Sequence, residues 1–262
     1  MTRDLVYGRN AVRELLRGPR EVFELWASER AAAQLPWLQA GPRVQVKPER
    51  TLTEAAGTRD HQGVVAWCEP FRYADAYALA ATRRGAAGPG AAGEGLPAGE
   101  GAPGGGGAPL LVCLDQVTDP HNLGAVVRSA EGAGASGVVL PAHRSARVTP
   151  AVCRASAGAV EHLPVAIVPN LARYLAEVKG PSLWAYAADP EGELAYWDAD
   201  LAGGVALVLG SEGRGVRPLV RRTCDALVSI PLHGLVPSLN VSVAAGVLLF
   251  EARRQRRARG EG

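Results

Sequence analysis

From residue 110 onward, the sequence alternates short apolar runs with segments of helical periodicity. The apolar runs are at residues 110–114, 137–140, 165–168, 183–187, 205–209 and 227–231. Strands that are apolar along their whole length are typical of a parallel sheet with helices on both faces. We therefore predict an α/β domain over residues 109–262, with ligand-binding loops at the carboxyl ends of its strands.

A glycine-rich segment divides the chain. Of the 24 residues from 85 to 108, 11 are Gly, 7 are Ala and 3 are Pro, which leaves little to bury and makes ordering costly. We predict a flexible linker over residues 76–108. It contains two GxGxxG sequences, but neither follows a strand pattern or precedes a helical one. A dinucleotide site, and with it a nicotinamide-dependent oxidoreductase, is therefore excluded.

Before the linker, a shorter alternation predicts a second domain. Strand-like runs at residues 21–27, 43–46 and 63–68 alternate with helical patterns that open near residues 10, 30 and 51. Strands and helices in this order are typical of a small α/β domain, which we place over residues 1–75.

The composition restricts the class of protein further. Hydrophobic residues make up 47% and charged residues 21% of the chain, as in ordinary globular proteins. No apolar run approaches the ~20 residues of a membrane-spanning helix, and the N-terminus lacks the apolar stretch of a signal peptide, so we expect a cytoplasmic protein. The four cysteines form no CxxC pair, which favours buried free thiols over a metal site.

Three loops that follow predicted strands carry residues suited to catalysis. The first contains Asn122, which we expect to start a helix as its cap, and Arg128 lies nearly two turns further on. The second places Glu212 among glycines, whose backbone can approach a ligand closely. A carboxylate there suits a cation or a hydroxyl better than nucleotide phosphates. The third contains Ser238 and Asn240 before the last helix, where capping is the simplest role of each.

In combination, the three loops resemble the motifs of the SpoU (TrmH) branch of the SPOUT superfamily of RNA 2'-O-ribose methyltransferases. The resemblance spans about residues 109–257, with all three motifs in order, and Ser156-Ala-Gly-Ala-Val-Glu161 is a further match. Residues 6–14 and 61–66 are similar to the small RNA-binding domain of the RlmB-like subgroup, which methylates a guanosine of 23S ribosomal RNA.

The resemblance implies an α/β fold with a Rossmann-like parallel sheet and a C-terminal trefoil knot, preceded by a small α/β RNA-binding domain. It implies S-adenosylmethionine as the cofactor, contacted by Gly210, Ile230 and Leu239 largely through backbone groups. It also implies a homodimer that acts on RNA, with neither a metal ion nor a membrane. The family's active-site positions correspond to Asn122, Arg128, Glu212, Ser238 and Asn240.

The role of Arg128 is open to two interpretations. The family's proposed proton acceptor is this arginine, but a guanidinium group stays protonated in proteins. A charged Arg128 can instead bind the adjacent phosphate and stabilise a developing alkoxide, while the other active-site residues fix the arginine and the ribose.

Other functions fit part of the pattern. A tRNA or antibiotic-resistance ribosomal 2'-O-methyltransferase of the same superfamily would share these motifs, and a non-catalytic RNA-binding assembly factor would share the fold. The complete set of active-site residues counts against the assembly factor. Arginine makes up 26 of the 28 cations, which suits phosphate binding, although codon bias in a GC-rich genome explains it equally well.

Overall fold

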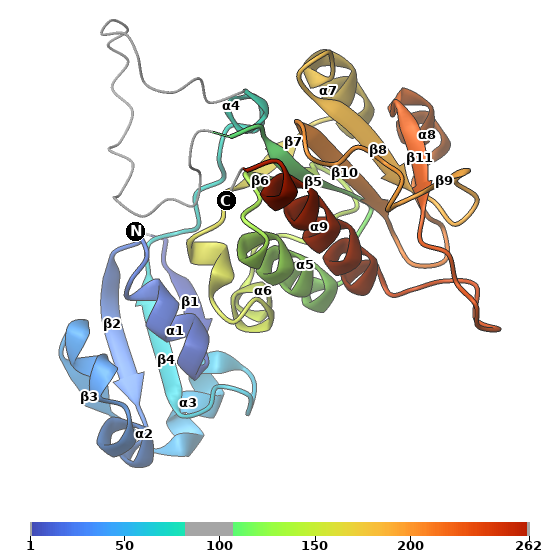
Figure 1. Ribbon diagram of the computed structural model, residues 1–262. Helices are drawn as coiled ribbons and strands as arrows, with labels where there is room; N and C mark the ends of the chain where they lie inside the picture. The colour runs from blue at the N-terminus through green and yellow to red at the C-terminus, as the bar shows by residue number, and fades with distance from the viewer. Residues whose placement is uncertain (1, 82–106, 261–262) are drawn as a thin grey trace, which may run out of the picture. The chain divides into compact units, whose positions relative to one another are not determined.

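The computed structural model describes residues 2–81 and 107–260 (Figure 1). The chain divides into two compact units, and each draws on segments that are distant in the sequence. The first unit comprises Met1–Arg72, Pro120–Arg128 and Ala146–His162, and the second comprises Tyr73–Asp119, Ser129–Ser145 and Leu163–Gly262.

A four-stranded sheet in the order β1-β4-β2-β3 forms the N-terminal part of the first unit. Its strands β2 (Val22–Ala27), β3 (Val44–Val46) and β4 (Val64–Cys68) confirm the three predicted ones. β1 (Asp4–Tyr7) lies outside the predicted strands because Val6 is its one buried residue. Helices follow three of the strands, as expected: α1 (Arg9–Leu15), α2 (Glu29–Gln34) and α3 (Glu49–Ala56), with the 3₁₀ helix η1 (Pro36–Ala40) before β3.

The first unit also contains α6 (Pro150–Ala155) and the 3₁₀ helix η2 (Ala159–Glu161), which pack against the N-terminal elements. A buried ion pair joins the two parts. Nε of Arg20 donates to Oε2 of Glu161 at 2.9 Å, and Nη2 donates to Oε1. Burial alone lowers the pKa of Arg20, but the hydrogen bond and the negative charge of Glu161 raise it above its usual value.

The second unit is built on a seven-stranded sheet in the order β7-β6-β5-β10-β8-β11-β9. Every neighbouring pair in this sheet is parallel, as the apolar runs predict. Six strands match those runs, and β9 is an addition. Their bounds are β5 (Leu110–Asp115), β6 (Gly137–Pro141), β7 (Val165–Val168), β8 (Trp184–Ala188), β9 (Leu194–Ala195), β10 (Val205–Gly210) and β11 (Ala226–Ser229).

Helices of the second unit cover this sheet. α7 (Leu171–Val178) and α8 (Pro218–Thr223) share an apolar cluster with Ala206 and Val208 of β10. The long C-terminal helix α9 (Val241–Ala258) contacts β10 as well (Figure 1). The mixed α/β class and the parallel sheet are confirmed. The strand order does not trace the path of a knot, which stays a prediction.

The predicted linker needs a correction at its start. Residues 76–80 form helix α4 (Ala76–Ala80), which contacts β7. Its position is fixed because the Tyr174 hydroxyl donates to the Ala76 carbonyl at 2.8 Å, and because Gly137 leaves room for the Leu79 side chain. The glycine-rich residues 82–106 lie outside the described residues.

Candidate active site

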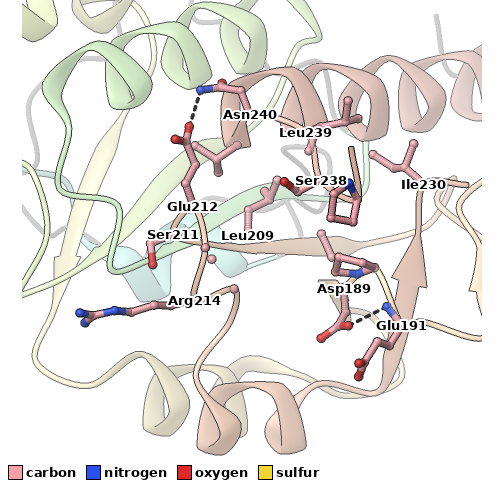
Figure 2. A pocket seen from close by; sticks show the side chains of 18 of the residues that line it. Asp189, Glu191, Leu209, Ser211, Glu212, Arg214, Ile230, Ser238, Leu239 and Asn240 are labelled. Carbon is pink, nitrogen blue, oxygen red and sulfur yellow. Dashed lines mark hydrogen bonds between the residues drawn. The ribbon is translucent and has the colours of Figure 1, made fainter. Parts of the chain in front are cut away.

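A cavity of about 640 Å³ lies at the carboxyl ends of three neighbouring strands, β8, β10 and β11 (Figure 2). Its walls come from the loops that leave these strands and from the start of α9. All its lining residues belong to the second unit. This is the edge of a parallel sheet where ligands bind in open α/β folds, and the volume suits a small-molecule cofactor.

The loop after β10 closes tightly on itself. Gly213 and Gly215 have positive φ angles of 77° and 64°, and Ser211 pairs with Gly215 across the loop. A Cβ atom at Gly210 would lie 1.9 Å from the carbonyl carbon of Gly215. Glycine is therefore required at Gly210, and its backbone faces the cavity without a side chain in the way.

Asn240 joins this loop to the start of α9. Its Oδ1 accepts from the backbone N–H of Ser242 at 2.8 Å, which confirms the predicted capping role. Its Nδ2 donates to Oε1 of Glu212, as the dashed line in Figure 2 marks. Since the cap fixes which way the amide points, the same side chain holds the Glu212 carboxylate beside the cavity.

The remaining walls combine apolar side chains with charged ones, among them Arg214. Ile230, Leu209 and Leu239 supply apolar surface (Figure 2). Asp189 and Glu191 line the cavity after β8, and Oδ1 of Asp189 accepts from the N–H of Glu191 at 2.9 Å.

These groups fit S-adenosylmethionine. The apolar side chains suit an adenine ring, and the glycine backbone allows close hydrogen bonds. The Glu212 carboxylate favours a positively charged sulfonium, whereas Asp189 and Glu191 pair with Arg221.

The structure brings together six of the eight residues that the resemblance implies. Gly210, Ile230, Leu239, Glu212, Ser238 and Asn240 all line the same cavity. Asn122 and Arg128 are not among its lining residues, and both lie on α5 (Pro120–Gly132), in the part that belongs to the first unit.

The expectation that Asn122 starts a helix as its cap is wrong. α5 begins at Pro120, so Asn122 lies inside the first turn. Proline is favoured at the first helical position because it has no N–H to leave unpaired there.

Asp115 is a residue of this region that the motifs did not identify. It ends the otherwise apolar strand β5, is fully buried and pairs in register with Gly210. Its carboxylate accepts from the backbone N–H of Arg217 at 2.8 Å, and Nη2 of Arg217 lies 2.7 Å away. Arg217 follows the glycine loop directly, so Asp115 fixes the far end of that loop. The clue in the sequence is a carboxylate at the end of a strand that is apolar everywhere else.

Two further features concern metals and membranes. In the part of the chain that the structure describes, no group of three or more His, Cys, Asp or Glu side chains is placed to hold a metal ion. Within residues 2–81 and 107–260, no helix is both long and apolar enough to span a bilayer.

Comparison with known families gives matches over both parts of the chain. Residues 109–250 match the model of the SpoU rRNA Methylase family, and residues 5–74 match the model described as RNA 2'-O ribose methyltransferase substrate binding.

Curated relatives match along almost the whole chain. The chain is 42% identical to the 23S rRNA (guanosine-2'-O-)-methyltransferase RlmB of Ralstonia nicotianae, with 96% of each protein covered. It is 37% identical to the RlmB of Shewanella oneidensis, over 97% of this chain and 98% of the relative.

Solved structures that are similar to this chain are also RNA methyltransferases. The SpoU methyltransferase AviRb of Streptomyces viridochromogenes, in complex with AdoMet, has a TM-score of 0.76 and 25% identity, over 98% of this chain and 91% of that one. A structure described as an RNA 2'-O ribose methyltransferase has a TM-score of 0.74 and 28% identity, over 97% of this chain and 89% of that one.

Proposed function

The chain belongs to the SpoU rRNA methylase family, and from this premise we propose that it methylates the ribose 2'-hydroxyl of a guanosine in 23S rRNA, with S-adenosylmethionine as methyl donor. The observation that carries the proposal is the cavity at β10, where residues from three separate loops meet. Gly210, Ile230 and Leu239 contact the cofactor there. The match of residues 5–74 to a substrate-binding model supports RNA as the other substrate.

For this reaction the protein must align the ribose 2'-hydroxyl with the methyl group and assist removal of the hydroxyl proton. S-adenosylmethionine, when bound, would supply the methyl group from a sulfonium, with a neutral thioether as the leaving group. Glu212 and Asn240 hold each other through one hydrogen bond, so they present a fixed carboxylate and amide to the ribose. Ser238 lines the same cavity and orients the ribose with them.

Arg128 and Asn122 complete the active-site set in this proposal. Arg128 is exposed on α5 and is available to a phosphate of the RNA. Its guanidinium binds that phosphate and stabilises the alkoxide that develops at O2', while the proton leaves to the phosphate or to water. Asn122, nearly two turns before it on the same helix, helps to fix the arginine and the ribose.

A homodimer is part of the proposal, and the surface of the second unit supports it. All ten residues from 231 to 240 are exposed, and among them Leu235 is 104% and Val236 is 70% exposed. Val243 and Phe250 add exposed apolar area on α9. Apolar patches of this kind mark protein interfaces. Sedimentation equilibrium should give twice the chain mass, and a monomer at micromolar concentration would refute the homodimer.

The proposal includes a cytoplasmic location for the enzyme, because its proposed substrate is ribosomal RNA.

The function is tested by mapping 2'-O-methylation at nucleotide resolution in ribosomal and transfer RNA. RNA is taken from cells with and without the gene, and from deleted cells that carry the wild type, Arg128→Ala or Arg222→Ala. Arg222 is an exposed arginine on α8 and serves as the matched control.

We expect one guanosine of 23S rRNA to lose its methyl group on deletion and to regain it with the wild type and Arg222→Ala only. Loss of a tRNA methyl group instead would support the tRNA enzyme. No change at any site would support the assembly factor and overturn the proposal.

A further inference from the structure

A second cavity, of about 330 Å³, lies within the N-terminal part of the first unit and shares no residue with the cavity at β10. Three arginines line it, Arg9, Arg30 and Arg59, together with one carboxylate, Glu49. Among the described residues, none of these arginines forms an ion pair with an Asp or Glu side chain. The cavity is therefore lined by three positive charges and one negative charge.

The floor of the cavity is a turn with an unusual backbone. Gln62 and Gly63 have successive positive φ angles of 53° and 78°. A Cβ atom at Gly63 would lie 2.6 Å from the hydroxyl oxygen of Ser28, so only glycine brings the turn this close to α2. A non-glycine residue such as Gln62 adopts this conformation at a cost, and strained residues of this kind cluster at ligand sites.

His61 holds the turn and is 2% exposed. The backbone N–H of Gly63 donates to its Nδ1 at 3.0 Å, so Nδ1 carries no proton and Nε2 does. Nε2 lies 3.0 Å from the Thr53 hydroxyl and 3.6 Å from Glu49. Thr53 therefore holds the ring, and the single carboxylate of the cavity lies near it without a hydrogen bond to it.

Two other donors are placed by the same turn. The Nε of Arg9 donates to the Gln62 carbonyl at 3.2 Å, and its backbone N–H donates to the Gln62 side chain at 3.0 Å. These bonds fix the guanidinium and leave both of its Nη groups for a ligand. Ser28 is 4% exposed. Its hydroxyl oxygen accepts a hydrogen bond from the Ala31 N–H at 3.3 Å, which leaves the hydroxyl proton for donation to a ligand.

We propose that this cavity binds a phosphate group of the backbone of the RNA substrate. The proposal rests on the proposed function and adds a specific contact to it. Several guanidinium groups around a small polar cavity match a tetrahedral anion, because each offers parallel N–H donors to its oxygens. A backbone phosphate carries no base identity, so the contact positions the RNA and does not read its sequence.

The test compares Arg30→Ala/Arg59→Ala with Arg43→Ala. All three arginines are exposed, but Arg43 does not line the cavity. Binding of the full chain to 23S rRNA from cells that lack the gene is measured by filter retention over a series of salt concentrations. We expect the double variant to bind at least tenfold more weakly. The slope of log affinity against log salt should become less negative by about 0.7 to 0.9, which is the change expected for the loss of one phosphate contact.

Two results would overturn the proposal. One is a double variant that binds like Arg43→Ala, and the other is weaker binding with an unchanged salt slope, which would place the arginines against bases. S-adenosylmethionine affinity and thermal unfolding, both expected to stay at wild-type values, report whether the fold is intact. If the double variant unfolds, the single variants carry the test. RNA binding is measured without methyl transfer, so the two proposals are tested separately. An absent methyl mark in cells refutes the proposed function, whereas the salt dependence of RNA binding tests the phosphate site.

Discussion

Replacing Gly210 by alanine should weaken cofactor binding while β10 stays folded. The new Cβ would lie 1.9 Å from the Gly215 carbonyl carbon, and contacts of real Cβ atoms are essentially never below 3.0 Å, so the two must separate by about 1.1 Å. Gly210 cannot move, because it is the end of β10 and pairs with Asp115 of β5. The loop therefore moves, and with it the backbone groups proposed to hold S-adenosylmethionine.

The size of the effect follows from that displacement. A shift of about 1 Å breaks backbone hydrogen bonds to the cofactor, and two such bonds to a charged ligand at about 1.5 kcal/mol each amount to about 3 kcal/mol, or about 100-fold in affinity. Arg217, which Asp115 holds through its backbone N–H at 2.8 Å, resists the shift from the other end of the loop. Gly210→Ala should therefore also lower the thermal stability of the protein without cofactor.

Titration calorimetry with S-adenosylmethionine, together with thermal unfolding, measures both effects. Gly180→Ala is the matched control, because a Cβ at Gly180 meets no atom within 4 Å. We expect wild-type affinity in the control and an affinity about 100-fold lower in Gly210→Ala. An affinity for Gly210→Ala within threefold of wild type would refute the assignment of the cofactor to this loop.

Two predictions concern stability. Glu161→Gln should cost about 3 kcal/mol in urea unfolding, because Arg20 would stay buried with only the more distant carboxylate of Asp4, at 3.5 Å. Glu54→Gln in the exposed pair with Arg50 should cost under about 0.5 kcal/mol. Equal costs would contradict this reasoning. Burial raises the pKa of the Cys68 thiol to about 11. Between pH 9 and 11 the unfolded thiol loses its proton and the folded thiol keeps it, so the free energy of unfolding should fall as pH rises. Cys68→Ala should make that fall shallower, and an unchanged slope would exclude the thiol as its source.

The parallel sheet was predictable from sequence because its central strands carry an unambiguous local pattern. All six residues of β5 are buried, and the run is apolar up to Asp115. β1 has no such pattern, because only one of its four residues is buried. It is a strand because it pairs with β4, about 60 residues away in the sequence. The order of β5, β10 and β8 is likewise a product of long-range packing that no local pattern contains.

The active-site motifs predicted which residues gather, but not how they hold one another. Capping by Asn240 was readable from its position before a helix. Its bond to Glu212 was not, because the two residues are 28 positions apart and meet only once β10 and β11 lie in one sheet. Asp115 was missed for a related reason. A carboxylate at a strand end is typical of an ordinary loop until its partner Arg217 is known.

The two cavities differ in the charged side chains that line them, and this difference bears on how an RNA enzyme of low net charge works. The cavity at β10 is lined by three carboxylates and one arginine, Arg214, and Arg221 pairs with two of the carboxylates, Asp189 and Glu191. It therefore offers RNA phosphates little positive charge. The net charge of the chain is only +2, so attraction for a polyanion must come from local clusters. The arginine cavity of the N-terminal part is such a cluster. We infer that Arg30 and Arg59 add RNA affinity outside the cavity at β10, so substitutions at these two residues should raise KM for RNA more than they lower kcat.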